Sequence, residues 1–419
     1  MNSHDDNEAH SEDQSILASG SQPQFRAHSE KKPPYAVEYA DGTFDLYGCG
    51  APSFKIRTTT RVDFERIFRR DPYALAVDFV RGEFSVEGDF VAAVRLYYAH
   101  PQSRMRFRVL SAVASLAIER LQGRFQTKHQ AASNIRFHYD HPFDFYRLIL
   151  DSRLVYSCAY FTHAEQPLDK AQHQKLAHIC RKLDIQAGEQ FLDVGCGWGG
   201  LVTYATEEHG ALSTGCTLST EQFNFASQQV QERSLGPRVR IELSDYRDIE
   251  GAFDKIASVG MVEHVGRVHL KGYFRKLNRL LKPGGLVLNH GITRPENAKD
   301  DSATLFVRRY MFPGGELPRL SEVIGSAESA GFEVLDVENL RPHYALTCHA
   351  WVRRLQENEK RCLRVVEPSV YRTWLLTLAA SAVHFEEGRL NLNQVLLYKP
   401  GYPDRRPFTR EYVYGRARV

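Results

Sequence analysis

The sequence predicts an α/β fold, with an open Rossmann-like sheet covered by helices on both faces and a small α+β domain before it. Its 419 residues are enough for two domains with cores of their own. From residue 190 onward, short apolar runs alternate with helical patterns, as in βαβ units. The first run, Phe191–Val194, contains an acid and leads into the glycine-rich turn Gly195–Gly200, where a ligand can approach the backbone closely. Such a turn is weakly specific by itself, and a plain tight turn is the alternative.

Residues 1–32 are polar and rich in Ser, Gln, His, Asp and Glu, so they cannot bury enough apolar surface to fold alone. We expect a disordered tail there. His4, His10 and His28 lie in this tail, and we expect them to be solvated because their spacing suits no defined metal site.

Residues 33–126 are expected to form the small domain and residues 127–419 the large one. In the small domain, Phe44–Tyr47 alternates apolar and polar residues and predicts a half-buried strand, and residues 81–89 predict a short hairpin. The expected helices are Val62–Arg70, Pro72–Val80, Phe90–Ala99 and Met105–Leu121. The polar, basic stretch Gln122–Asn134 is expected to link the two domains.

The large domain is expected to contain the sheet. Its expected strands are Phe191–Val194, Ser213–Thr217, Val239–Leu243, Phe253–Val259, Leu286–Leu288, Glu333–Val337 and Asn393–Tyr398. Its expected helices include Leu168–Leu183, Leu201–His209 and Tyr371–Phe385. Ser219 and Gln222 have the spacing of a capping box at the start of a further helix. In the first of the helices, Lys175 is expected on the solvated side.

The connection Thr293–Leu320 is long, and connections of this length are unusual unless they are functional. Over an active site it would form a wall of a substrate channel. The apolar surface for that wall would come from Phe306, Tyr310, Met311 and Phe312. Ordinary core packing of an inserted helix is the alternative.

Composition narrows the class of protein. A net charge of +3 is too small to imply nucleic acid. The 7 cysteines are scattered without a C-x-x-C pair, which fits a reducing compartment and predicts neither a disulfide framework nor a zinc site. No apolar run reaches the ~18–20 residues that span a bilayer, so a cytoplasmic protein is the expectation. The arginine-rich end, Lys399–Val419, could touch anionic lipid head groups or could simply be solvated.

Dehydrogenases usually place a carboxylate at the end of the second strand, whereas this chain has Thr217 there, which speaks against a standard NAD site. Six motifs point elsewhere. They are Tyr-Ser-Cys-Ala-Tyr-Phe at 156–161, Ala-Gln-x-x-Lys-Leu at 171–176, Gly-Cys-Gly-Trp-Gly-Gly at 195–200, Met-x-Glu-His-Val-Gly at 261–266, Leu-Lys-Pro-Gly-Gly at 281–285 and Tyr-Met-Phe-Pro-Gly-Gly at 310–315. Together with His343-Tyr344-x-x-Thr347, they resemble S-adenosylmethionine-dependent methyltransferases and, more narrowly, the cyclopropane fatty acid synthase family.

The resemblance is strong from about His138 to Lys399, weaker over Val62–Gln126, and absent before Lys32. It implies a class I methyltransferase sheet, and for the small domain it implies lipid binding or pairing of subunits, with a structural cap as the alternative. The chain departs from the family pattern at Pro142, where a glycine is usual, so this turn is stiffer.

The resemblance implies transfer of a methyl or methylene group from S-adenosylmethionine to a cis double bond of a phospholipid acyl chain, giving a cyclopropane. A bound bicarbonate ion would be the base. Its implied ligands are the side chains of Glu263, His290 and Tyr344 and the backbones of Cys158 and Ile292. Donor contacts are implied for Tyr156, Ser157, Asp193, Gly195, Gly197, Thr217, Gln222 and Tyr246.

Each acid–base residue has a structural alternative. Glu263 could cap the next helix, His290 could be a satisfied core histidine, and Tyr344 could be a packing residue. Cys158 is not expected to be a nucleophile, because nothing around it in the sequence would lower the pKa of its thiol.

Three other functions compete with this interpretation. They are methylation of an acyl chain without ring closure, another small-molecule or nucleic-acid methyltransferase on the same fold, and a non-catalytic lipid-binding module. The favoured partners are unsaturated phospholipid acyl chains at the inner face of a membrane, bound peripherally. A homodimer is possible, and neither nucleic acid nor a metal site is expected.

Overall fold

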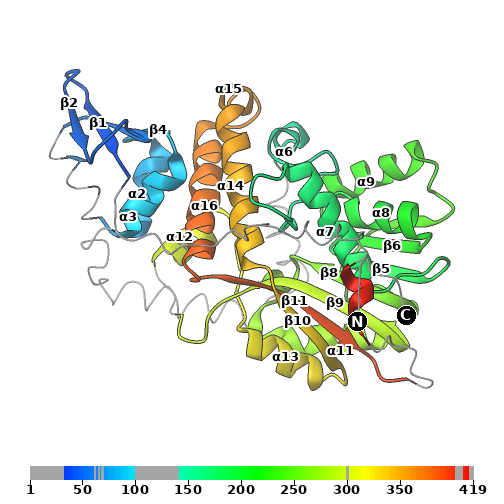
Figure 1. Ribbon diagram of the computed structural model, residues 1–419. Helices are drawn as coiled ribbons and strands as arrows, with labels where there is room; N and C mark the ends of the chain where they lie inside the picture. Colours follow the sequence, from blue (N-terminus) through cyan, green and yellow to red (C-terminus); the bar gives the residue numbers. More distant parts are fainter. Residues whose placement is uncertain are drawn as a thin grey trace, which may run out of the picture.

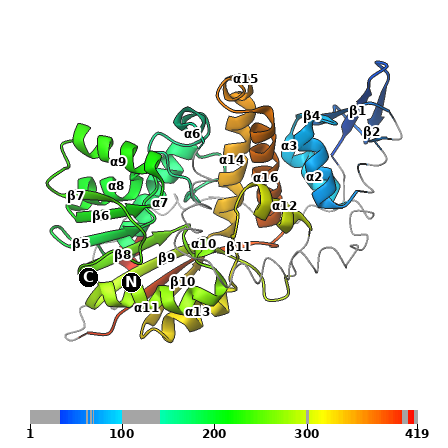
Figure 2. The same ribbon diagram turned by 180° about the vertical axis from the view of Figure 1, so that it is seen from behind.

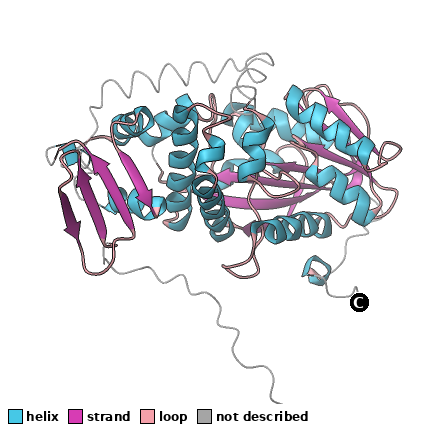
Figure 3. Cartoon of the chain, turned by 90° about the horizontal axis from the view of Figure 1, so that it is seen from above, coloured by secondary structure: helices cyan, strands magenta, loops and turns pink. Residues whose placement is uncertain are grey.

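In the computed structural model, the structure describes residues 33–60, 63, 64, 67, 70–99, 141–298, 302–401 and 409–414. The expectations for residues 1–32, Met105–Leu121, Gln122–Asn134 and most of the arginine-rich end lie outside these residues, as does most of Val62–Arg70. The described residues form two sheets with a block of helices between them (Figures 1 and 3).

In its described residues the small domain has a four-stranded sheet in the order β2-β1-β3-β4, with α2 and α3 packed beside it (Figure 1). Its elements are β1 (Tyr35–Tyr39), β2 (Phe44–Tyr47), β3 (Phe54–Thr58), α2 (Pro72–Arg81), β4 (Ser85–Gly88) and α3 (Phe90–Ala99). Asp71 caps α2 by accepting from the backbone N–H groups of Tyr73 and Ala74. Gly82, with φ +83°, ends this helix in the left-handed conformation that glycine adopts most readily.

Two expectations for the small domain are wrong. Residues 81–89 do not form a hairpin, because β4 pairs antiparallel with the distant β3. In β2 the alternation is present but inverted, since Phe44 and Leu46 are 66% and 63% exposed. An edge strand has only one neighbour, so β1 and its helices decide which side of β2 is covered.

The large sheet has seven strands in the order β10-β11-β9-β8-β5-β6-β7. They are β5 (Gln190–Val194), β6 (Leu212–Thr217), β7 (Val239–Leu243), β8 (Phe253–Val259), β9 (Leu281–Thr293), β10 (Glu333–Asn339) and β11 (Asn391–Tyr398). The five strands from β9 to β7 are parallel, whereas β11 and β10 are antiparallel additions at one edge. The chain reverses its direction of travel across the sheet between β5 and β8, which is where ligands bind in open α/β folds.

Helices cover both faces of this sheet, as the sequence predicts. On one face, α7 (Leu168–Lys182), α8 (Gly200–His209) and α9 (Thr220–Glu232) pack in a core with Phe191 of β5. On the other face, α11 (Leu270–Leu280) and α13 (Leu320–Glu328) pack with Leu192 and Val194. Alternate residues of one strand therefore enter two different cores.

The two sheets are joined by α14 (Arg341–Glu357) and α16 (Pro368–Glu386), which stand between them (Figure 2). Their core contains Trp351 and Trp374 and continues into Phe79 and Phe90 of the small domain. The remaining elements are α6 (Phe143–Ile149), α10 (Val262–Val265), the 3-10 turn Arg267–His269, α12 (Ser302–Tyr310), α15 (Glu359–Cys362) and the 3-10 turn Glu411–Tyr414. Because this core is shared, the small domain is packed directly against the part of the chain that holds the site.

The expected turn before the fifth strand lies inside β9. Pairing with β8 shifts register between Phe253 and Lys255, so residues 282–285 form an irregularity in a strand that begins at Leu281. Gly284, with φ +82°, permits this bend.

Candidate functional site

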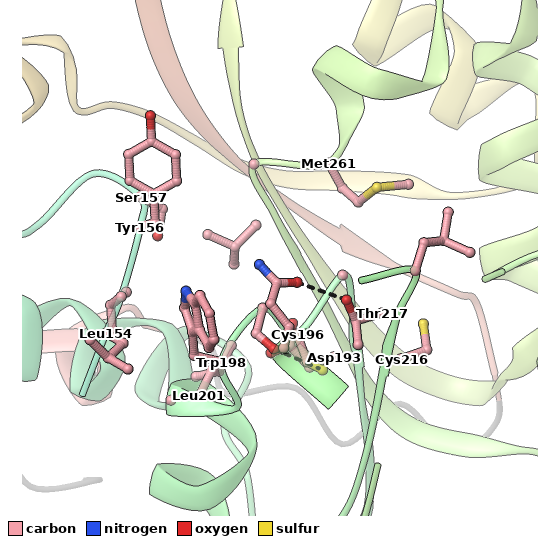
Figure 4. A pocket seen from close by; sticks show the side chains of 18 of the residues that line it. Leu154, Tyr156, Ser157, Asp193, Cys196, Trp198, Leu201, Cys216, Thr217 and Met261 are labelled. Carbon is pink, nitrogen blue, oxygen red and sulfur yellow. Dashed lines mark hydrogen bonds between the residues drawn. The ribbon is translucent and has the colours of Figure 1, made fainter. Parts of the chain in front are cut away.

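A first cavity, called here the donor cavity, opens at the carboxyl end of β5 beside the reversal point of the sheet (Figure 4). All eight residues expected to contact the donor line it: Tyr156, Ser157, Asp193, Gly195, Gly197, Thr217, Gln222 and Tyr246. They come from segments up to ninety residues apart in the chain, and the sheet brings their ends to one edge. Their role in binding stays a prediction.

The glycine-rich turn leaves room for a ligand. Gly197 has φ +54°, and a Cβ atom built on it would have no atom within 4 Å, so the backbone faces open space there. At Gly195 a Cβ atom would lie only 2.9 Å from the Cγ atom of Met261. Gly197 is therefore needed to keep space open for a ligand, whereas Gly195 is needed because Met261 packs against it.

Thr217 and Gln222 form one side of the donor cavity. The hydroxyl of Thr217 donates to the Oε1 atom of Gln222 at 2.7 Å (Figure 4). Ser219 is the N-cap of α9, and its hydroxyl accepts from the backbone N–H of Gln222 at 3.4 Å. Because the Gln222 side chain points to Thr217, the reciprocal half of the expected capping box is not formed.

Asp193 gives the donor cavity an acidic group. It is 3% exposed, and its Oδ1 atom has no hydrogen-bond partner among the described residues. Burial raises the pKa of its carboxyl to about 7, and the nearby Lys175 ammonium opposes this rise. A buried, unpartnered carboxylate fits a ligand that carries positive charge, as S-adenosylmethionine does in its sulfonium and amino groups.

Lys175 is not on the solvated side of its helix, contrary to the expectation. It is 1% exposed, lines the donor cavity, and donates to the Ser157 hydroxyl at 2.9 Å. Both flanks of α7 are covered, so the solvated side is narrower than an amphipathic pattern suggests. A signal was present, because Leu168, Gln172, Lys175 and Ile179 share one face at helical spacing.

A second cavity, called here the apolar chamber, has a volume of about 590 Å³ and adjoins the first. The two share Tyr156, Ser157, Gly260 and His264. Its walls come from both domains: α2 and α3 contribute Leu75, Phe79, Phe90 and Val94, α16 contributes Leu376 and Ala380, and α12 contributes Phe306 and Val307. This volume is within the range of small-molecule sites in proteins.

The long connection after β9 does form part of a cavity wall, through Phe306 and Phe312. Tyr310 and Met311 do not line the chamber. Met311 is 2% exposed in the core, and Tyr310 stacks on Phe306 with ring centroids 4.8 Å apart. Phe306 and Phe312 thus follow the cavity-wall interpretation of this segment, whereas Tyr310 and Met311 follow the core-packing interpretation.

Of the five residues expected around the base, Glu263, Ile292 and Tyr344 line the apolar chamber. The Oε1 atom of Glu263 accepts from the backbone N–H of Ile292 at 2.7 Å, whereas Oε2 is buried and has no partner in the described parts of the chain. Burial raises the pKa of Glu263 to about 7. Glu263 lies within α10, and neither the following 3-10 turn nor α11, whose N-caps are Gly266 and His269, begins with a side-chain cap bond, so the helix-cap alternative is wrong.

The other expected groups lie deeper. His290 is fully buried; its Nδ1 atom contacts the side-chain amide of Gln394 at 3.1 Å, and Nε2 has no partner within the described ranges. Burial lowers the pKa of His290 well below its usual value. Cys158 is also fully buried, and burial raises the pKa of its thiol, which makes it a poor nucleophile.

Two details differ from the implied ligand set. The Ile292 N–H is already bonded to Glu263, so this donor is occupied. Tyr344 is both a chamber residue and a packing residue, because its ring stacks on Phe385 at 4.6 Å. Burial raises the pKa of Tyr344 well above its usual value, so its hydroxyl stays a hydrogen-bond donor at neutral pH.

His264 has no role in the sequence-based assignment, yet it lines both cavities. Burial lowers the pKa of its imidazole to about 4, so the ring is neutral at pH 7. Its position directly after Glu263 in the Glu-His-Val-Gly motif is the signal that could have identified it.

Within the described residues, no helix is long and apolar enough to cross a membrane, and no three His, Cys, Asp or Glu side chains are grouped to hold a metal ion.

Comparison with known proteins finds one family model, described as mycolic acid cyclopropane synthetase, that matches residues 126–395. A Pseudomonas putida protein named probable fatty acid methyltransferase is 46% identical over 281 residues, which are 64% of this chain and 70% of that protein. A tuberculostearic acid methyltransferase of Mycobacterium tuberculosis is 36% identical over 62% of this chain and 63% of its own length. Cyclopropane mycolic acid synthase 1 of the same species is 34% identical over 61% of this chain and 93% of its own length.

Solved structures agree with this match. The cyclopropane synthase MmaA2 from Mycobacterium tuberculosis has a TM-score of 0.62 at 30% identity, over 64% of this chain and 98% of that chain. The mycolic acid cyclopropane synthase CmaA1, complexed with SAH and CTAB, has a TM-score of 0.61 at 34% identity over the same shares. Coclaurine N-methyltransferase, at 21% identity and a TM-score of 0.58 over 81% of this chain and 99% of that chain, shares the fold.

Proposed function

This chain belongs to the mycolic acid cyclopropane synthetase family, and we propose that it transfers a one-carbon unit from S-adenosylmethionine to a cis double bond of a phospholipid acyl chain and closes a cyclopropane ring. The methyltransferase fold is shared with solved S-adenosylmethionine enzymes. The phospholipid substrate, the bicarbonate base and ring closure by this chain are the parts of the proposal that go beyond the family match.

The observation that carries the proposal is the junction of the two cavities. The apolar chamber meets the donor cavity at Tyr156, Ser157, Gly260 and His264. An acyl chain in the chamber could thus bring a double bond next to a methyl donor in a site sheltered from water. A polar acceptor would gain little from walls made of Phe79, Phe90 and Phe306.

Bound S-adenosylmethionine would supply an electrophilic methyl group. The double bond needs no base in order to attack it, but positive charge then develops on the acyl chain. Tyr156 and Phe312, which line the chamber, offer aromatic faces that stabilise cations. His264 supports the same step because its neutral ring adds no repelling charge.

Ring closure requires removal of a proton from the transferred carbon, so that the C–H electron pair can form the second C–C bond. The Oε2 atom of Glu263 and the Nε2 atom of His290 are buried polar atoms without partners among the described residues. Together with Tyr344 they fit a small oxyanion such as bicarbonate, because the His290 N–H and the Tyr344 hydroxyl can donate to it while Glu263 accepts its O–H. The bound ion would supply the base.

A product without a ring is the second candidate. The relatives with higher identity, at 46%, 40% and 36%, are named fatty acid or tuberculostearic acid methyltransferases, whereas the named cyclopropane synthases begin at 34%. The two candidates share every step up to the cation. A ring or a methylene group then forms with loss of a proton, whereas a saturated methyl branch would need a hydride from a separate reductant.

The deciding experiment is proton NMR of lipid isolated from a host that lacks such lipids and expresses this chain. Cyclopropane methylene protons resonate far upfield and would support ring closure. Vinylidene or methyl-branch signals would instead support the second candidate. Unchanged lipids would contradict the proposal that the substrate is a lipid.

A further inference from the structure

Lys175 lines the donor cavity, and neither the family match nor the site assignment gives it a role. Lys175 donates to the Ser157 hydroxyl at 2.9 Å, and Gln172, one turn earlier on α7, donates to the Ser157 carbonyl at 2.8 Å. Ser157 lies at the junction of the donor cavity and the apolar chamber. Two side chains of α7 therefore hold the segment at the junction of the two cavities.

Lys175 also places a positive charge in a buried region that contains few other charged groups. The titratable groups that act on it electrostatically are Asp151, Cys158 and Asp193. Burial raises the pKa of the Cys158 thiol and lowers that of the His290 imidazole, which senses Lys175 from β9, so both are neutral near pH 7. Asp151 is held by the backbone N–H groups of Val155 and Arg153, at 2.8 and 3.0 Å.

Asp193 has a different environment. Its other titratable neighbours are the thiols of Cys180, Cys196 and Cys216, whose pKa values are all raised by burial. Lys175 is the group that lowers the pKa of Asp193 against the effect of burial. Among the described residues, the ionised form of Asp193 thus depends on one lysine.

We propose that Lys175 is a positioning residue of the donor site, which holds Ser157 in place and keeps the Asp193 carboxylate charged for the cationic amino end of the donor. The proposal rests on the donor half of the proposed function and is independent of the acyl acceptor.

The proposal predicts in which direction donor affinity changes with pH. With a pKa of about 7, Asp193 loses its charge as the pH falls through 7, so donor affinity should fall in the same range. Burial lowers the pKa of Lys175 to about 8, so both groups are charged together between about pH 7 and 8, and the wild type begins to lose the lysine charge above that range. Loss of the lysine charge should move the Asp193 transition upward by ~1–3 pH units, the usual effect of a close opposite charge.

The test is calorimetry of S-adenosylmethionine binding between pH 6 and 9. For Lys175→Met, which keeps most of the apolar stem and removes the charge, we expect affinity to fall about 5-fold or more at pH 7 and to recover toward pH 9, in line with that shift. Lys175→Arg should keep the wild-type profile up to about pH 8, where the lysine is still charged. Ser157→Ala, which removes the hydroxyl contact and leaves both charges, should change affinity without moving the transition.

A Lys175→Met profile parallel to the wild type would overturn the proposal. If that variant does not fold, Asp193→Asn decides instead: it must abolish the pH dependence near 7, and a transition that persists in it contradicts the role given to Asp193. Failure of the wild type to bind donor at every pH would be a separate result, and it would overturn the donor half of the proposed function.

Discussion

Replacing Glu263 by glutamine removes one negative charge from the wall of the apolar chamber and changes little else. Glutamine keeps an oxygen that can accept from the Ile292 N–H, the contact that Glu263 makes at 2.7 Å. It replaces the unpartnered Oε2 atom with an amide that cannot accept a proton from a bound ion. Donor binding should be unchanged, because Glu263 lines the chamber and not the donor cavity.

The expected loss of turnover is about 10²–10⁴-fold, the usual contribution of a general acid–base group, which corresponds to about 3–5 kcal/mol of activation free energy. The wild-type rate at saturating donor should rise as the pH increases through about 7, where Glu263 ionises, and this rise should be absent in the variant. Saturating donor is needed because Asp193 has a pKa in the same range.

The same substitution, which lowers turnover, should increase the stability of the fold. A carboxyl whose folded pKa is about 7 stabilises the fold fully only below its unfolded pKa, and this contribution is lost as the pH rises toward 7. At pH 8, Glu263→Gln should therefore unfold at a higher urea concentration than the wild type. Its free energy of unfolding should be larger by up to roughly 3 kcal/mol.

Turnover on unsaturated phospholipid vesicles, measured beside donor calorimetry and urea denaturation, separates these effects. Glu316→Gln is the matched control, since Glu316 lies nearby and accepts from the Arg267 N–H at 3.0 Å but lines neither cavity. Undiminished turnover of Glu263→Gln, or the same loss in the control, would refute the role given to Glu263.

Three further results are expected. Gly197→Val should abolish donor binding in calorimetry, because its side chain would enter the open space beside a backbone with φ +54°, whereas Gly236→Ala, also in open space but away from both cavities, should bind normally. Ala380→Trp should fill part of the apolar chamber and lower turnover on vesicles while leaving donor affinity intact; equal losses of both would contradict the separation of the cavities. The protein should float with vesicles of unsaturated phospholipid, since an acyl chain must leave the bilayer to reach the chamber, and activity on tRNA with none on vesicles would favour a different acceptor.

The strands at the centre of the large sheet and the donor loop could be predicted from the sequence. Phe253–Val259 has the predicted bounds, because an apolar run between turn residues encodes a buried parallel strand locally. The edge strand Val239–Leu243 also has the predicted bounds, and its sequence alternates apolar and charged residues. Six of the eight predicted donor residues lie at or just beyond the carboxyl ends of parallel strands, which meet at one edge of the sheet, or on the helix that follows. Tyr156 and Ser157 reach the same cavity from a segment that α7 holds.

The tertiary structure alone decided which faces are covered. Lysine is usually a surface residue, yet Lys175 is 1% exposed, because its ammonium group donates to the Ser157 hydroxyl and interacts with the charge of Asp193. Phe44 and Leu46 look like core residues, yet they are 66% and 63% exposed because no described segment covers their side of β2. The apolar chamber joins α2 to α16 across almost three hundred residues. A residue's own chemistry and its near neighbours determine the local backbone, but burial depends on which distant segment packs against it, and that is settled only when the whole core forms.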